Sequence, residues 1–168
     1  MTGLRTEVHR DAAALDALRD EWDDLLERSD ASVFQSWEWL SCCRRHLSPR
    51  GRLYVITVRD GERLMGLAPM ETAPLGLGLR RLRFVGTGPT DYLDFLVDRE
   101  GAPEVLDTIL AHFEAHARRW AAIDLQQEFP HVAVGLQGPR EGGTQQFSDV
   151  VGQRQILDAV PFAGRHAE

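Results

Sequence analysis

Two amphipathic stretches open the chain, and their spacing predicts helices. Over residues 11–28, large apolar side chains recur at three- and four-residue intervals, while aspartates and glutamates occupy the other faces. A second stretch covers 34–47, and Ser32 and Gln35 at its start have the spacing of a capping box. We therefore expect the first third of the chain to be helical. The second stretch should bury one stripe of side chains, formed by Phe34, Trp37, Leu40, Cys43 and Leu47.

In the second third of the chain, β-branched and aromatic residues replace the helical periodicity and predict strands. Asp60-Gly61 is typical of a type I′ hairpin turn between the first two strands. Three of the strands are expected to form an antiparallel meander. The expected strands cover 53–58, 63–70, a segment around Leu82 and Phe84, and 92–97.

A third helix and a further strand are predicted after these strands. The helix is expected over 102–119, the strand follows around Ile123, and a last strand is expected within 150–157. The fold class is therefore α+β, a mixed, mostly antiparallel sheet flanked by helices. We expect residues 1–134 to form one domain and 135–168 to form an irregular C-terminal tail.

Composition narrows the class of protein. The chain has 19 basic and 26 acidic residues, a formal net charge of −7, and 43% hydrophobic residues. An acidic chain is a poor partner for nucleic acid, because neutralising phosphates needs a basic surface. No apolar run reaches the roughly 20 residues that span a bilayer, and the first residues lack the apolar core of a signal peptide. We expect a soluble, cytoplasmic protein with no nucleic acid partner and no membrane span.

One short motif matches a known phosphate-binding sequence. Residues 63–68 fit R-x-x-G-x-A, the loop with which GNAT acyltransferases hold the phosphates of coenzyme A at a helix N-terminus. Here the match follows a hairpin turn and leads into Pro69, so we expect a strand and no phosphate loop. The six histidines do not stand at metal-ligand spacing, and no metal site is predicted.

Two polar groups are candidate binding or catalytic residues. Arg81 and Arg83 share one face of a predicted strand, where they form either a solvated face or an anion site. Asp91, Tyr92 and Asp94 follow a glycine-rich turn at the entrance to the next predicted strand. There Asp91 either caps the turn or acts as a general base, and Tyr92 either packs on the sheet or donates a proton.

An ordered set of segments resembles one protein family. The set consists of Phe34-Gln35-Ser36 with Trp39-Leu40, Asp60-Gly61, Leu64 to Met70, Gly86 with Asp91-Tyr92-x-Asp94, and Trp120 before Ile123-Asp124-Leu125. In this order, over about residues 20–127, the segments resemble the N-terminal half of BioF2-like and CelD-like acyltransferases. That family belongs to the GNAT superfamily and is related in architecture to the FemAB aminoacyl ligases.

The resemblance implies a GNAT-like fold and an N-acyltransferase that moves an acyl group from acyl-CoA, its co-substrate, to a small-molecule amine. Asp91 would be the base or amine anchor, and Tyr92 would be a proton donor. The substrate-binding residues would be Asp94, Trp39, Arg81 and Arg83.

The resemblance also bears on partners. Members of this family usually carry two GNAT-like halves, with the machinery for the acyl donor in the second. We therefore expect the chain to be incomplete alone and to pair, as a homodimer or heterodimer, with a second GNAT-like domain or copy. The alternative is a degenerate, non-catalytic GNAT fold that serves as a binding or assembly module.

Overall fold

One mixed sheet organises the protein. A computed structural model gives the fold, and the structure describes residues 3–47, 51–88, 90, 92–125 and 133–134. The hydrogen-bonded strand order is β1-β2-β3-β4-β6-β7, and β5 also pairs with β3. β4 and β6 run parallel, while the other pairs run antiparallel. The strands are β1 (Arg5–His9), β2 (Arg52–Asp60), β3 (Arg63–Gly76), β4 (Leu79–Phe84), β5 (Leu96–Val97), β6 (Ala122–Asp124) and β7 (Ala133–Val134).

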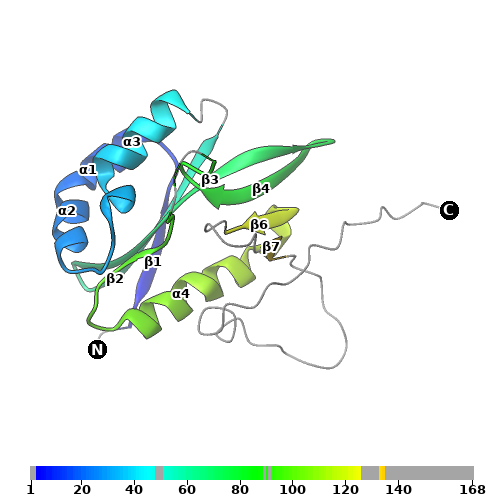
Figure 1. The fold of residues 1–168 in the computed structure, drawn as a ribbon. Coiled ribbons are helices and arrows are strands. Elements are labelled where there is room, and N and C mark those ends of the chain that lie inside the picture. The colour runs from blue at the N-terminus through cyan, green and yellow to red at the C-terminus, as the bar shows by residue number, and fades with distance from the viewer. Residues whose placement is uncertain (1–2, 48–50, 89, 91, 126–132, 135–168) are drawn as a thin grey trace, which may run out of the picture.

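Helices lie on both sides of this sheet. Figure 1 shows α1, α2 and α3 on one side and α4 on the other. The helices are α1 (Ala12–Ala17), α2 (Arg19–Glu27), α3 (Trp37–His46) and α4 (Ala102–Ala115), with short 3-10 helices η1 (Val33–Gln35) and η2 (Ala117–Arg119). The predicted fold class, a mixed and mostly antiparallel sheet flanked by helices, is confirmed.

β2, β3 and β4 form the predicted antiparallel meander. The β2–β3 turn lies one residue later than predicted, because Asp60 pairs with Arg63 and leaves Gly61 and Glu62 as the loop. Gly61 has a φ of +59°, which glycine adopts without strain. The 63–68 motif lies within β3, so the prediction of a strand there is confirmed.

The predicted strand over 92–97 is wrong for most of its length. Only Leu96 and Val97 form β5, which pairs with two residues of β3. β4 pairs with β3 from Met70 to Gly76, so that part of the edge is not open to the residues before β5. Tyr92 has a φ of +58°, outside the β region. The residues before β5 therefore form a loop, although Leu93 in that loop is buried as it would be in a strand.

The helices predicted over 11–28 and 34–47 are confirmed, with breaks that the periodicity does not reveal, but the strand β1 precedes them in the third of the chain expected to be helical. Two helices, α1 and α2, replace the single predicted helix and meet at Leu18. Ser32 and Gln35 form the predicted capping box, but they do so on η1. Ser36 then caps α3 through a hydrogen bond from the Trp39 backbone N–H to its hydroxyl.

The predicted buried stripe of α3 is only partly correct. Leu40 and Cys43 are buried, whereas Phe34 and Trp37 are partly exposed. Leu47 is exposed because α3 ends at the residue before it. The stripe is therefore buried only in the middle of the helix, where α3 covers the sheet.

The C-terminal elements follow the prediction up to residue 125. The predicted helix over 102–119 is α4 followed by η2, and the predicted strand around Ile123 is β6. The strand expected within 150–157 and the tail expected from residue 135 lie outside the described residues.

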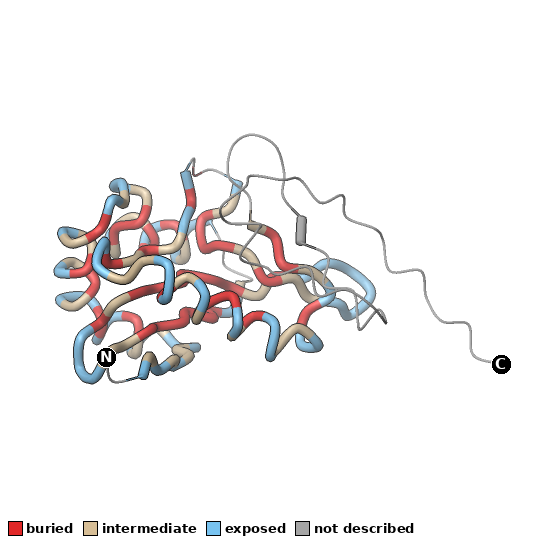
Figure 2. The backbone as a smooth tube through the Cα atoms, turned by 90° about the horizontal axis from the view of Figure 1, so that it is seen from below, coloured by how far each residue is buried: buried red, intermediate tan, exposed pale blue. Residues whose placement is uncertain are grey.

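The core lies between the sheet and its two helical layers. In Figure 2 the buried segments follow the strands and the inner sides of the helices. Burial of these apolar side chains is the main favourable term in folding. The largest fully buried apolar side chains are Trp22, Leu25, Ile56, Leu67, Met70, Leu82, Leu93, Leu96, Ile109, Phe113 and Ile123.

A tyrosine–histidine contact joins the sheet to α4. The Tyr54 hydroxyl lies 3.1 Å from Nε2 of His112 on α4, and the centroids of the two rings are 6.1 Å apart. Burial lowers the pKa of His112 to about 4, with further lowering by the positive charges of His116, Arg119 and Arg10. The neutral imidazole is therefore the form that the folded protein favours.

We expect this histidine to make the protein less stable in mild acid. Between pH 6.5 and about 4, the unfolded chain protonates His112 while the folded protein does not, so the free energy of unfolding falls. The expected loss in the free energy of unfolding is about 2 kcal/mol. This is less than the full pKa shift would give, because the ring is only partly buried. Urea unfolding at several pH values should show a shallower pH dependence for His112→Gln. The control His46→Gln, at an exposed position, should keep the original slope; an unchanged slope in His112→Gln would contradict this account.

Candidate functional site

The loop between β4 and β5 packs against α3 through Thr90. This threonine is buried, and its hydroxyl accepts a hydrogen bond of 3.0 Å from Nε1 of Trp39. Sγ of Cys43 lies 3.7 Å from the same hydroxyl. Gly86 has a φ of +90°, and a Cβ at this position would lie 2.9 Å from Oγ1 of Thr90. The glycine therefore lets the loop approach α3 closely.

Gln35 holds the same loop two residues further along. Its side-chain amide donates a hydrogen bond to the Tyr92 carbonyl, while its Oε1 accepts from the Ser32 backbone N–H at 2.8 Å and from the Ser32 hydroxyl at 2.7 Å. The Gln35 carbonyl accepts from Nε1 of Trp22 at 2.8 Å. A buried amide with its side-chain oxygen and nitrogen both engaged is rigid and costly to remove. The segment around Gln35 and the segment around Tyr92, 57 residues apart in sequence, thus meet in space.

Three aromatic rings form one side of this contact. Phe34 meets Trp39 edge to face, with ring centroids 5.3 Å apart, and stacks on Tyr92 at 6.3 Å. Tyr92 is 66% exposed, and both other rings are partly exposed. Such a surface can contact an apolar group or the face-on charge of an ammonium group.

Of the two aspartates predicted beside Tyr92, the structure describes only Asp94. Asp91 lies outside the described residues, between Thr90 and Tyr92, which are each held by the contacts above. Asp94 is exposed, and its Oδ1 accepts a hydrogen bond of 2.8 Å from the Phe95 backbone N–H. Asp94 therefore shapes the loop before β5 as well as presenting a carboxylate at the surface.

Arg81 and Arg83 lie on β4, immediately before the loop, and each contacts a carboxylate. Arg83 pairs at 2.8 Å with Glu71, which is 1% exposed and stands opposite it on β3. Arg81 pairs at 3.2 Å with Asp124 of β6. Both arginines thus cross-link the sheet, and Nε of Arg81 is buried without a hydrogen-bond partner among the described residues.

The R-x-x-G-x-A match lies in acidic surroundings. Arg63 pairs with Asp98 at 2.9 Å and with Glu100 at 3.6 Å, and Arg28 also pairs with the buried Asp98. Glu104 lies in the first turn of α4, which begins just after these residues. A helix N-terminus holds phosphate through free N–H groups and its positive dipole end. Surrounded by carboxylates, this one does not fit the phosphates of coenzyme A.

The adjacent cysteines have different surroundings. Cys42 is exposed and Cys43 is buried. Burial raises the pKa of the Cys43 thiol, against a smaller opposite effect of its contact with Thr90. Cys43 is therefore a neutral packing residue beneath Gly86 and Thr90, and it does not have the environment of a nucleophile.

The described part of the chain has neither a metal-binding cluster nor a membrane-spanning helix. No three histidine, cysteine, aspartate or glutamate side chains there are grouped so that they could hold a metal ion. Among the helices described, none has the length and apolar character needed to cross a bilayer.

The sequence motifs identified residues on both sides of this contact but not the hydrogen bonds that join them. They named Trp39 and Tyr92, and they placed Gln35 in a capping box and in a segment of the family resemblance. Thr90 was missed because a threonine after Gly-Pro is an ordinary turn residue in sequence. The carboxylate partners Glu71 and Asp124 were missed because strand register is needed to pair them with the arginines.

No protein-family model and no curated protein matches the sequence. Among solved structures, the fold is similar to a ribosomal-protein-alanine N-acetyltransferase from Brucella melitensis biovar Abortus 2308, at 15% identity and a TM-score of 0.44, over 99% of both chains. It is also similar to a spermidine N-acetyltransferase from Vibrio cholerae in complex with CoA and spermine. There the identity is 14% and the TM-score 0.37, over 73% of this chain and 69% of that one. At TM-scores below 0.5, these likenesses do not establish a shared family or reaction.

Proposed function

We propose that the protein is an N-acyltransferase domain that binds the amine acceptor, while a second GNAT-like domain or copy holds the acyl-CoA. The observation that carries the proposal is the contact between two of the segments on which the family resemblance rests. Gln35 and Trp39 from one segment anchor Tyr92 and Thr90 of the other. Two segments that carry the resemblance therefore contact each other beside an exposed aromatic surface.

The acceptor would bind at the three aromatic rings, next to the loop that carries Asp91 and Asp94 in its sequence. The rings of Phe34, Trp39 and Tyr92 would contact its ammonium and carbon chain, as aromatic faces do with cations. Asp91 would anchor the ammonium and then remove its proton, and the Tyr92 hydroxyl would donate a hydrogen bond. Asp94 adds a second negative charge to the same loop.

The arginines of β4 would support this site from beneath. Arg83 and Arg81 neutralise Glu71 and Asp124, so the sheet face next to the loop carries paired charges. In amide formation the amine nitrogen attacks the thioester carbonyl, the carbon–sulfur bond breaks, and the thiolate leaves. The chain's own contribution would be to hold the amine in the geometry of attack and to accept its proton. The acyl-CoA would be held by the second domain or copy, because the carboxylates around the start of α4 do not fit its phosphates.

A second function has one observation in its favour. The carboxylates around the start of α4 and the pairing of Arg63 with Asp98 argue against a donor site in the described part of the chain. A GNAT-like fold without a donor site could serve as a non-catalytic binding or assembly module. In that case its partner would be a second GNAT-like domain, and no amine would bind.

Calorimetry distinguishes the two functions. We expect the chain to bind a primary amine from a panel of an alkylamine, a diamine and an N-terminal peptide. Coenzyme A should bind no tighter than about 100 μM. Asp91→Asn should weaken amine binding at least tenfold, with an unchanged melting temperature, because the substitution keeps the turn chemistry and removes the charge. The control Asp107→Asn makes the same change at an exposed position of α4 and should bind normally.

The outcomes are separable. If no amine binds and sedimentation shows a self-associated or partner-bound chain, the assembly function replaces the acceptor function. Coenzyme A binding in the low micromolar range would overturn the absence of a donor site. Unchanged amine binding by Asp91→Asn would remove this residue from the site.

A further inference from the structure

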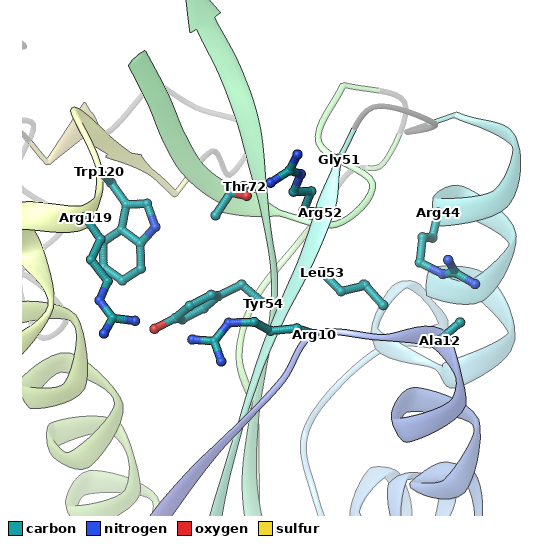
Figure 3. Close-up of a pocket in the computed structure, with 10 residues that line it drawn as sticks. All are labelled: Arg10, Ala12, Arg44, Gly51, Arg52, Leu53, Tyr54, Thr72, Arg119 and Trp120. Atoms are coloured by element: carbon teal, nitrogen blue, oxygen red, sulfur yellow. The ribbon is translucent and has the colours of Figure 1, made fainter. Parts of the chain in front are cut away.

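A cavity lies at another part of the sheet, where β1 ends and β2 begins. It is an open cavity of about 520 Å³ that includes none of the residues of the β4–β5 loop. Figure 3 shows its lining, drawn from β1, α3, β2, β3 and the segment after α4. The lining residues are Arg10, Ala12, Arg44, Gly51, Arg52, Leu53, Tyr54, Thr72, Arg119 and Trp120.

The lining carries positive charge and no acidic residue among those described. Arg10 follows β1, Arg44 lies on α3, Arg52 begins β2 and Arg119 ends η2. None of these four arginines forms an ion pair with a carboxylate in the described part of the chain. This differs from the chain as a whole, whose net charge is −7. Seven other arginines are paired there: Arg19, Arg28, Arg59, Arg63, Arg81, Arg83 and Arg99.

Two of the positive groups, Arg10 and Arg119, lie beside Tyr54. Cζ of Arg10 lies 5.0 Å from the centroid of the Tyr54 ring, and Figure 3 shows Arg10 and Arg119 on either side of the tyrosine hydroxyl. That hydroxyl contacts His112, whose pKa is lowered in part by Arg119 and Arg10. Burial is the main cause of this lowered pKa, and the positive charges of Arg119 and Arg10 add to it.

The cavity also has an unused hydrogen-bond donor. Nε of Arg44 is buried and has no partner among the described residues. A buried donor without a partner costs free energy, and in native proteins such groups are usually matched by a ligand, an ion or water. Arg44 faces the cavity from the α3 side, where Leu53 and Ala12 also lie.

We propose that this cavity binds a small molecule through a phosphate group. Several guanidinium groups without carboxylate partners call for a ligand with at least two negative charges, since one carboxylate would neutralise only one of them. Guanidinium groups match the oxygens of phosphate in pairs of parallel hydrogen bonds. The cavity volume is in the range of small-molecule sites and exceeds that of a single phosphate ion, so the cavity also has room for an organic group.

The site is independent of the proposed amine site. None of the residues that line the cavity has a part in the acceptor function, although Arg44 lies on the same helix, α3, as Trp39. Loss of phosphate binding would therefore leave amine binding unchanged, and failure of the amine titration would leave this proposal standing.

NMR titration of the full chain tests the proposal with inorganic pyrophosphate, AMP and citrate, each at constant ionic strength set with sodium chloride. We expect both phosphate compounds to bind more tightly than citrate and to shift the signals of His112 and Trp120. Bound phosphate should also raise the pH at which His112 titrates, because it neutralises Arg10 and Arg119. Tighter binding of AMP than of pyrophosphate would show that the organic body contributes.

Matched arginine variants give the control. Arg10→Gln and Arg119→Gln should each weaken phosphate binding at least tenfold, since each removes one charge from the cavity. Arg5→Gln makes the same change at an exposed position on β1, at the opposite end of the strand from Arg10, and should bind as the original chain does. Equal loss in Arg5→Gln, equal binding of citrate, or no binding beyond that of chloride would each overturn the proposal.

Discussion

Trp22→Ala is expected to lower the free energy of unfolding by about 3–5 kcal/mol, as truncation of a fully buried large aromatic residue does. Trp22 is 1% exposed on α2, and its Nε1 donates a hydrogen bond to the Gln35 carbonyl. The substitution therefore leaves a cavity and an unpaired carbonyl below η1. Urea unfolding monitored by circular dichroism measures the loss.

Trp37→Ala is the matched control for this prediction. The sequence pattern places Trp37 on the buried stripe of α3, but in the structure it is only partly buried. Its Nε1 donates to the Leu15 carbonyl at 3.2 Å, and Arg19 lies over its ring at 4.6 Å. We expect a smaller loss, about 1–2 kcal/mol, because much of the ring already contacts water. Equal losses in the two variants would contradict the burial difference.

The elements that sequence predicted well are those whose signals are local. The helical spacing of 11–28, the capping box at Ser32 and the β-branched run at 53–58 each depend on residues close in sequence. The meander followed because the turn at Gly61 is short enough to force antiparallel pairing. These features need no knowledge of the rest of the chain.

The strand predicted over 92–97 failed because its outcome depends on distant residues. Its apolar alternation is real, since Leu93 and Leu96 are buried. Pairing, however, requires a free strand edge, and β4 already occupies most of that edge of β3. Gln35 also holds the Tyr92 carbonyl from a segment 57 residues away. Neither the edge nor this hydrogen bond can be read from the residues of the loop.

The candidate site shows the same division. The sequence motifs singled out Trp39 and Tyr92, and the structure brings their segments together. From the sequence alone, Arg83 could bind an anion. The strand register places the buried Glu71 opposite Arg83, and the two form an ion pair. Arg10 and Arg119, which have no carboxylate partner in the described part of the chain, are more than 100 residues apart in sequence, and only the fold brings them together.

Gly66 separates a structural role from the phosphate-binding role that its motif suggests. It lies on β3, where α4 crosses the sheet. A Cβ at this position would lie 2.3 Å from Cγ1 of Val105, far inside normal contact. Val105 is buried and β-branched, so its methyl groups cannot turn away at low cost. The glycine is thus explained by close packing of α4 on the sheet.

Gly66→Ala should therefore destabilise the protein by about 2–3 kcal/mol, because the added methyl group pushes α4 off β3. Val105→Ala should also destabilise when introduced alone, through the cavity that it leaves. Combined, the two substitutions should cost less than the sum of the single losses by at least about 1 kcal/mol, since the small residue makes room for the methyl group. Gly3→Ala, at a position with no neighbouring atom within 4 Å, should change the urea midpoint little. Strictly additive losses at Gly66 and Val105 would show that the helix does not limit the size of residue 66.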